Sequence, residues 1–146
     1  MPDYVSRSEI LIRTPSERVW DVLTATGSNP DIMFGADIQS EWTEGSAITW
    51  TGEYKGTEFR DTGTVVEVVR PERLVYTHFS PLSGGEDTPA NHHTITVTLA
   101  SVAEGTRVTL AQDKNGTPEA AADSEENWML MLRGLRTVAQ GDPSDE

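Results

Sequence analysis

The N-terminal part of the chain carries two successive hydrophobic patterns. Residues 4–13 (YVSRSEILIR) alternate between apolar and polar side chains, which predicts a β-strand. Residues 14–17 (TPSE) form a capping box with proline at the first helical position, so we expect a helix with Thr14 as its N-cap. Gly27 is expected to end this helix. A short helical turn is predicted at 31–34.

From residue 37 to residue 113 the pattern changes to period two, with turn residues between short runs. Strands are predicted at 37–42, 46–55, 58–70, 73–80, 91–102 and 106–113. The segment 81–90 (PLSGGEDTPA) is rich in proline, glycine and serine and is predicted to be a loop. Alternating faces of this kind are typical of an antiparallel sheet that has one face covered.

A helix is predicted from 118 to 139. Its apolar positions follow the 3.6-residue period and form a wide stripe: Trp128, Met131, Leu132, Leu135 and Val138. This helix is the one large apolar element left to cover the sheet. The sequence therefore predicts an α+β helix-grip fold. About seven strands would curve around the long C-terminal helix, with a short helical segment after the first strand.

Four segments carry a resemblance to a known superfamily. They are TPSERVWDVLT at 14–24, GTVVEVVRPERLVYTHF at 63–79, GTRVTLAQD at 105–113 and ENWMLMLRGL at 126–135. The chain resembles the START-like (SRPBCC) superfamily, and within it the branch related to the activator of heat shock protein 90 ATPase homologue. This resemblance implies the helix-grip fold of the birch pollen allergen. It does not choose a function, because the superfamily includes lipid carriers, polyketide cyclases, toxin-resistance proteins and the co-chaperone itself.

Length and composition indicate one globular domain. The chain has 146 residues, no cysteine and a net charge of −13. We expect a single domain at 1–141 and an acidic flexible tail at 142–146. The absence of cysteine excludes disulfides, thiolate catalysis and iron–sulfur clusters.

The charge and hydropathy of the chain also bear on its partners. An evenly acidic surface repels nucleic acid and anionic membranes, so neither is an expected partner. No apolar run reaches the roughly 18 residues of a membrane span. The first residues lack the basic and apolar regions of a secretory signal, so we expect a cytoplasmic protein.

A sheet curled around a helix leaves room for an apolar cavity. The candidate lining residues are Trp42, Trp50, Tyr54, Phe59, Tyr76, His78, Trp128, Met131, Leu132 and Leu135. Gly52 and Gly63 would leave space inside their strands. The alternative is that the large side chains simply fill a dense core.

Three residues are candidates for acid–base chemistry. Asp61 and Glu67 share one face of the long predicted strand by period two, and an acid facing an apolar cavity can act as a general acid or base. His78 is the third candidate. The alternative is a solvated face with ion pairs across the sheet. Neither a recognised metal signature nor a cofactor motif is present, so we expect no metal and no cofactor.

Three functions remain open at this stage. The leading hypothesis is a binding module that encloses a small hydrophobic molecule, lipid or polyketide-like, with residues 28–36 and 81–90 as gates. The second is a cyclase, dehydratase or hydrolase acting on a polyketide-like or aromatic substrate. The third is a chaperone-linked or regulatory interaction protein. A homodimer is compatible with all three.

Overall fold

The computed structural model describes residues 4–28, 36–54, 56–80 and 92–140. Within these residues, eight strands and two helices follow one another. They are β1 (Tyr4–Ile12), α1 (Ser16–Leu23), β2 (Gly27–Ser28), β3 (Asp37–Ser40), β4 (Ala47–Tyr54), β5 (Thr57–Val69), β6 (Arg73–His78), β7 (His93–Val102), β8 (Gly105–Asn115) and α2 (Pro118–Gln140). The predicted turn at 31–34, the loop at 81–90 and the tail at 142–146 lie outside the described residues.

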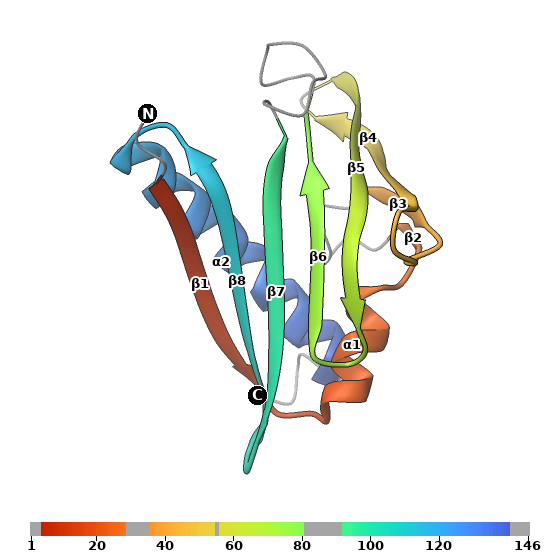
Figure 1. Cartoon of the computed structure of the whole chain (residues 1–146), viewed down its shortest axis with the longest axis vertical. Coiled ribbons are helices and arrows are strands. Elements are labelled where there is room, and N and C mark those ends of the chain that lie inside the picture. Colours follow the sequence, from red (N-terminus) through yellow and green to blue (C-terminus); the bar gives the residue numbers. More distant parts are fainter. Residues whose placement is uncertain (1–3, 29–35, 55, 81–91, 141–146) are drawn as a thin grey trace.

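The strands form one antiparallel sheet in the order β1-β8-β7-β6-β5-β4-β3-β2. Neighbours in the chain are neighbours in the sheet from β2 to β8, and β1 closes the order by pairing with β8. Helix α2 crosses one face of this curved sheet, and α1 lies near the C-terminal end of α2 (Figure 1). The predicted helix-grip fold is confirmed. The eighth strand is β2, a two-residue strand that pairs with β3.

The core lies between α2 and the inward-facing side chains of the sheet. Leu132 and Leu135 of α2 are fully buried, as are Ile95 of β7 and Leu110 of β8. Full burial of such a side chain stabilises a fold by about 1.5–3 kcal/mol. The apolar stripe of α2 therefore holds the helix against the sheet, as the sequence pattern predicts.

Helix α1 begins differently from the prediction. Its N-cap is Pro15, and no side chain caps the helix. The expected capping box is wrong, because the Thr14 hydroxyl donates instead to the Ala139 carbonyl at the end of α2, at 3.4 Å. The helix also ends earlier, at Leu23, while Gly27 begins β2.

A bulge in β5 changes which side chains face the core. Val65 pairs with Tyr76 and Glu67 with Val75, so Val66 is an extra residue on this strand. A bulge of this kind shifts the alternation by one position. The expectation that Glu67 shares the inward face of Asp61 is therefore wrong.

Trp42 also departs from the predicted pattern. Strand β3 ends at Ser40, so Trp42 lies beyond it and does not continue its alternation. The residue adopts a positive φ of 56°. Its side chain is half-buried and packs against the core. The turn after it is held by Ser46, whose hydroxyl donates to the Thr43 carbonyl at 2.7 Å.

Candidate functional site

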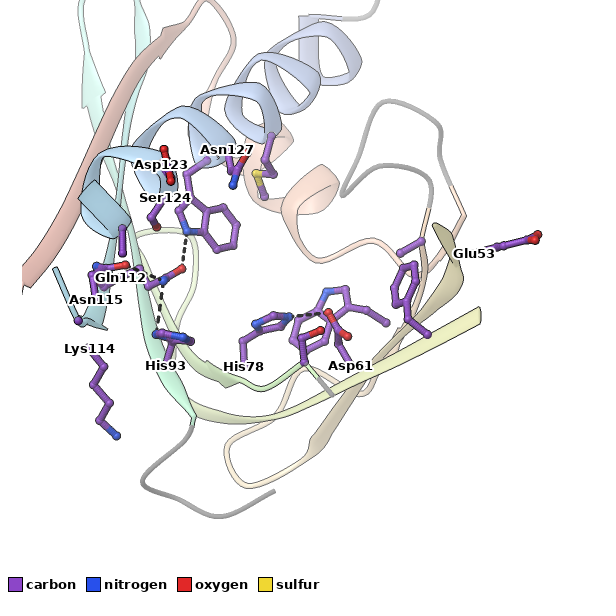
Figure 2. A pocket seen from close by; sticks show the side chains of 18 residues that line it. Glu53, Asp61, His78, His93, Gln112, Lys114, Asn115, Asp123, Ser124 and Asn127 are labelled. Carbon is purple, nitrogen blue, oxygen red and sulfur yellow. Dashed lines mark hydrogen bonds and ion pairs between the residues drawn. The ribbon is translucent and has the colours of Figure 1, made fainter. Parts of the chain in front are cut away.

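A pocket of about 710 Å³ lies between the first half of α2 and the ends of strands β4 to β8. Figure 2 shows this space, with α2 on one side and the side chains of the sheet opposite. Its apolar and aromatic lining consists of Ala36, Trp50, Phe59, Ala120, Trp128 and Met131. Its polar lining consists of Glu53, Asp61, His78, Ser80, His93, Gln112, Lys114, Asn115, Asp123, Ser124 and Asn127. The volume is in the range of small-molecule sites, roughly 300–1,000 Å³.

Five of the ten predicted ligand contacts line this pocket. They are Trp50, Phe59, His78, Trp128 and Met131. Two glycines make room for the rings, as expected from the sequence. A Cβ on Gly52 would lie 3.0 Å from the Phe59 ring, and one on Gly63 would lie 3.2 Å from the Trp50 ring.

The other predicted contacts lie elsewhere. Leu132 and Leu135 are buried further along α2, where the helix packs on the sheet. Tyr76 is buried behind Trp50, with ring centroids 5.8 Å apart. Trp42 packs against the core and does not line the pocket. The side chain of Tyr54 lies outside the described residues.

The candidate acid–base residues separate into a pair in the pocket and one residue on the surface. His78 of β6 and Asp61 of β5 lie side by side, with Nε2 of His78 2.9 Å from Oδ2 of Asp61. Both side chains are largely buried, with exposures of 19% and 14%. Glu67 instead forms an exposed ion pair with Arg73, at 2.9 Å, outside the pocket.

The His78–Asp61 pair is bordered by aromatic rings. The Trp50 ring contacts His78 edge-on, with centroids 4.9 Å apart and planes at 74°. Oδ1 of Asp61 is buried without a hydrogen-bond partner among the described residues. The pair therefore combines a fixed imidazole with an apolar wall. This is an arrangement that can accept or hold a proton.

Behind Trp50, burial also affects an ionisable group. Tyr76 is 4% exposed, and burial raises the pKa of its hydroxyl well above the ordinary value. The phenol therefore stays neutral under ordinary conditions and acts as a packing residue for Trp50.

A second hydrogen-bond network fixes the opposite wall of the pocket. The Trp128 indole N–H donates to Oε1 of Gln112 at 2.7 Å. The Gln112 amide donates to Oδ1 of Asn115 at 3.2 Å, and the Asn115 amide donates to the Tyr4 carbonyl at 2.7 Å. The network ties α2, β8 and β1 together. It holds the Trp128 ring in place as part of the pocket wall.

Sequence reasoning missed several polar residues of the pocket, above all His93 and Gln112. A signal for both exists in the alternation of their strands. His93 precedes Ile95 by two positions, and Gln112 follows Leu110 by two, so each extends an apolar inward row with a polar residue. The same is true of His78 after Tyr76. Among the described residues, no group of three or more histidine and acidic side chains is placed to hold a metal ion.

Comparison with known proteins places the chain in a family. Residues 13–140 match the family described as Activator of Hsp90 ATPase homolog 1-like protein. The chain belongs to this family. It is thereby a member of the START-like (SRPBCC) superfamily, as its sequence segments indicate. A search of curated proteins found no match.

Solved structures show the same fold in related proteins. ChR145 from Cytophaga hutchinsonii is 39% identical, with a TM-score of 0.80 over 92% of each chain. DynU16, a protein in the dynemicin biosynthetic locus, is 20% identical with a TM-score of 0.76, over 98% of this chain and 50% of that one. Ara h 8.0201 is 11% identical with a TM-score of 0.72, over 97% of this chain and 100% of that one.

The family and its fold are compatible with binding of hydrophobic ligands. The described helices of this protein include none that is long and apolar enough to cross a membrane.

Proposed function

We propose that this protein binds a small hydrophobic molecule in the pocket between its sheet and α2. The observation that carries the proposal is the composition of the wall. Trp50, Phe59, Trp128 and Met131 converge on one space of about 710 Å³, and the polar groups of the pocket include a fixed histidine. A concave site that combines apolar rings with placed polar groups is typical of ligand pockets.

The energy available from such a wall is sufficient for useful affinity. A ligand group the size of an aromatic side chain buries about 200 Å², which yields about 5 kcal/mol at ~25 cal/mol per Å². The cost of association and ordering subtracts from this gain. Two such groups, one against Trp50 and one against Trp128, yield about 10 kcal/mol, and after an association cost of at least about 4 kcal/mol about 6 kcal/mol remains, a Kd of tens of micromolar at best.

The first test fills the pocket with a larger side chain. Met131 is buried and lines the pocket, whereas Leu130, the preceding residue of α2, is 51% exposed. We expect the fluorescent dye anilinonaphthalene sulfonate to bind the wild-type protein. The Met131→Trp variant should bind it at least about tenfold more weakly, which is about 1.4 kcal/mol.

Leu130→Trp is the matched control, because it adds the same ring to the outer face of the same helix. Its dye affinity should equal that of the wild type. Equal weakening in both variants would place the dye outside the pocket and contradict the proposal. Native mass spectrometry of the protein from its own host then identifies the natural occupant as an added mass of a few hundred daltons.

Proton transfer is a second candidate function, favoured by the His78–Asp61 pair. A catalytic role would assign the base to His78 and the positioning to Asp61, since their atoms lie 2.9 Å apart beside the pocket wall. Glu67 is not proposed for this role, because its carboxylate is bound to Arg73 on the surface. A pH–rate profile that loses a limb in His78→Phe would support turnover of an identified occupant.

A further inference from the structure

The sheet side of the pocket contains two histidines at directly opposed positions of neighbouring strands. His78 of β6 pairs in register with His93 of β7. Side chains at directly opposed positions of an antiparallel pair lie on the same face, with Cβ atoms about 4.5–5.5 Å apart. Figure 2 shows the two rings along the same side of the pocket, opposite α2. Both residues line the pocket.

The hydrogen bond to Asp61 determines where the proton of His78 resides. Nε2 of His78 is 2.9 Å from Oδ2 of Asp61, and an ionised carboxylate can only accept. Nε2 therefore carries the hydrogen, and Nδ1 of the neutral ring carries a lone pair. Nδ1 has no hydrogen-bond partner within the described part of the chain. His78 thus presents an acceptor to the pocket.

The position of the hydrogen on the His93 ring is also fixed, by a different partner. Its Nδ1 lies 2.9 Å from the Asp113 carbonyl oxygen, which can only accept, so Nδ1 carries the hydrogen. The longer contact from the Gln112 amide to the same nitrogen, at 3.4 Å, cannot form at the same time. The lone pair of the neutral ring then lies on Nε2. The two neighbouring imidazoles therefore both present acceptors.

Two hydrogen-bond donors of the opposite wall are already engaged by the protein. The Trp128 N–H donates to Gln112, and the Asn115 amide donates to the carbonyls of Tyr4 and Gln112. A carbonyl or ether oxygen placed beside His78 would meet another lone pair and would lose its hydrogen bond to water. Burial of a polar group without a partner costs about 1–3 kcal/mol. A hydroxyl at this place avoids that cost, because it can donate.

We propose that the occupant of the pocket is a ring-sized apolar molecule with a hydroxyl group, and that this hydroxyl donates to Nδ1 of His78. Asp61 is the positioning residue, because it keeps the hydrogen on Nε2. The aromatic rings of Trp50 and Trp128 hold the apolar body. This inference rests on the proposed function and adds the chemistry of the ligand to it.

The test compares two molecules that differ in one hydrogen-bond donor. β-Naphthol can donate from its hydroxyl, whereas its methyl ether has nearly the same shape and can only accept. Titration calorimetry at about pH 8 measures the affinity of each compound. The wild-type protein should bind β-naphthol about tenfold or more tightly than the ether, which corresponds to about 1.4 kcal/mol.

Two variants test whether this preference depends on the His78–Asp61 pair. His78→Phe keeps a ring but removes the acceptor, so we expect the preference to fall below about twofold while the ether still binds. Asp61→Asn offers both a donor and an acceptor, so it no longer fixes the proton on Nε2, and the preference should also fall. Nitrogen NMR of the wild-type imidazole should show a protonated Nε2 and an unprotonated Nδ1, and a mixture in Asp61→Asn.

The controls lie outside the pocket. His92→Phe removes a histidine that stacks on Phe79, with centroids 5.4 Å apart, and Glu67→Gln removes a surface carboxylate. Both variants should keep the wild-type preference. A loss of preference in either control would show a general structural effect and overturn the assignment to His78.

The outcomes separate this inference from the proposed function. If the wild-type protein binds neither naphthalene compound and no anilinonaphthalene sulfonate, the proposed function fails. If both naphthalene compounds bind equally, or if the preference persists in His78→Phe, only the present inference fails. The same holds if the dye binds and β-naphthol does not. If His78→Phe fails to fold, the inference can still be refuted. The affinities of the two naphthalene compounds for the wild-type protein and the NMR signals of its imidazole both test it without a variant.

Discussion

Gly63 of β5 lies close to the backbone of β6 and to the pocket wall. A Cβ at this position would overlap the carbonyl oxygen of Thr77 and come within 3.2 Å of the Trp50 ring. The backbone of β5 and the wall of the pocket can therefore approach each other only if this residue has no side chain. The glycine links the packing of the sheet to the position of Trp50.

This contact predicts a large effect of a single methyl group. Gly63→Ala should lower the free energy of unfolding by about 1–3 kcal/mol, because the strands must separate or the methyl must clash. Gly116→Ala is the control, since a Cβ there meets nothing within 4 Å and its effect should stay within about 0.5 kcal/mol. Urea denaturation of both variants gives the comparison. Equal stabilities would show that β5 and β6 are not in close contact at Gly63.

At the scale of elements, the alternation of apolar residues predicted the strands well and the faces of β5 less well. Period two cannot reveal an inserted residue, because the bulge at Val66 is specified by pairing with β6 and not by the strand itself. The bulge moves Glu67 to the ion pair with Arg73 and turns Val68 toward the core. The sequence therefore predicted the position of β5 correctly, but it did not predict that the Glu67 carboxylate points outward.

The C-terminal end of α2 is held by a residue from α1. The last turn of α2 has no basic residue of its own. The Arg18 guanidinium donates to the Ala139 carbonyl at 3.2 Å and to the Val138 carbonyl at 3.3 Å. A cation at this end satisfies free carbonyls and complements the helix dipole. Arg18 thus joins the two helices at the end of the molecule away from the pocket.

Replacement of Arg18 tests this connection. Arg18→Met keeps much of the apolar stem and should lower the free energy of unfolding by about 1 kcal/mol, with a smaller effect at high salt. Arg133→Met is the control, because Arg133 is exposed on α2 and has no hydrogen bond within the described residues. Dye binding should be unchanged in both variants. An Arg18→Met protein as stable as the control would contradict the capping role.

At the scale of the whole molecule, the fold was predictable and the site only in part. The period-two pattern of the strands and the amphipathic pattern of the last helix are sufficient to specify a sheet that curls around α2. The stripe of α2 does not reveal which turns touch the sheet. Trp128 and Leu135 share it, yet one lines the pocket and the other fills the core. That difference depends on how α2 crosses the sheet, which is a property of the assembled fold.

The packing behind the pocket also determines how the whole molecule responds to alkaline pH. Tyr76 is buried, and its folded-state pKa is raised above the ordinary value of 10.0. The unfolded chain therefore loses this proton first as the pH rises, while the folded protein retains it. Its stabilising contribution is fully present below pH 10.0 and is lost progressively above that value, by about 1.4 kcal/mol per pH unit.

Comparison with Tyr76→Phe isolates this contribution. The net charge of −13 also disfavours the compact state at alkaline pH, but both proteins share that repulsion. Urea denaturation at several pH values between about 9 and 11.5 should show parallel stabilities below pH 10 and a steeper fall for the wild type above it. Above pH 10, the difference in the free energy of unfolding between the wild type and Tyr76→Phe should grow with each increase in pH, because only the wild type must keep a buried phenol protonated. Parallel curves throughout would mean that Tyr76 ionises as readily in the folded protein as in the unfolded chain. The wall behind Trp50 would then be open to water.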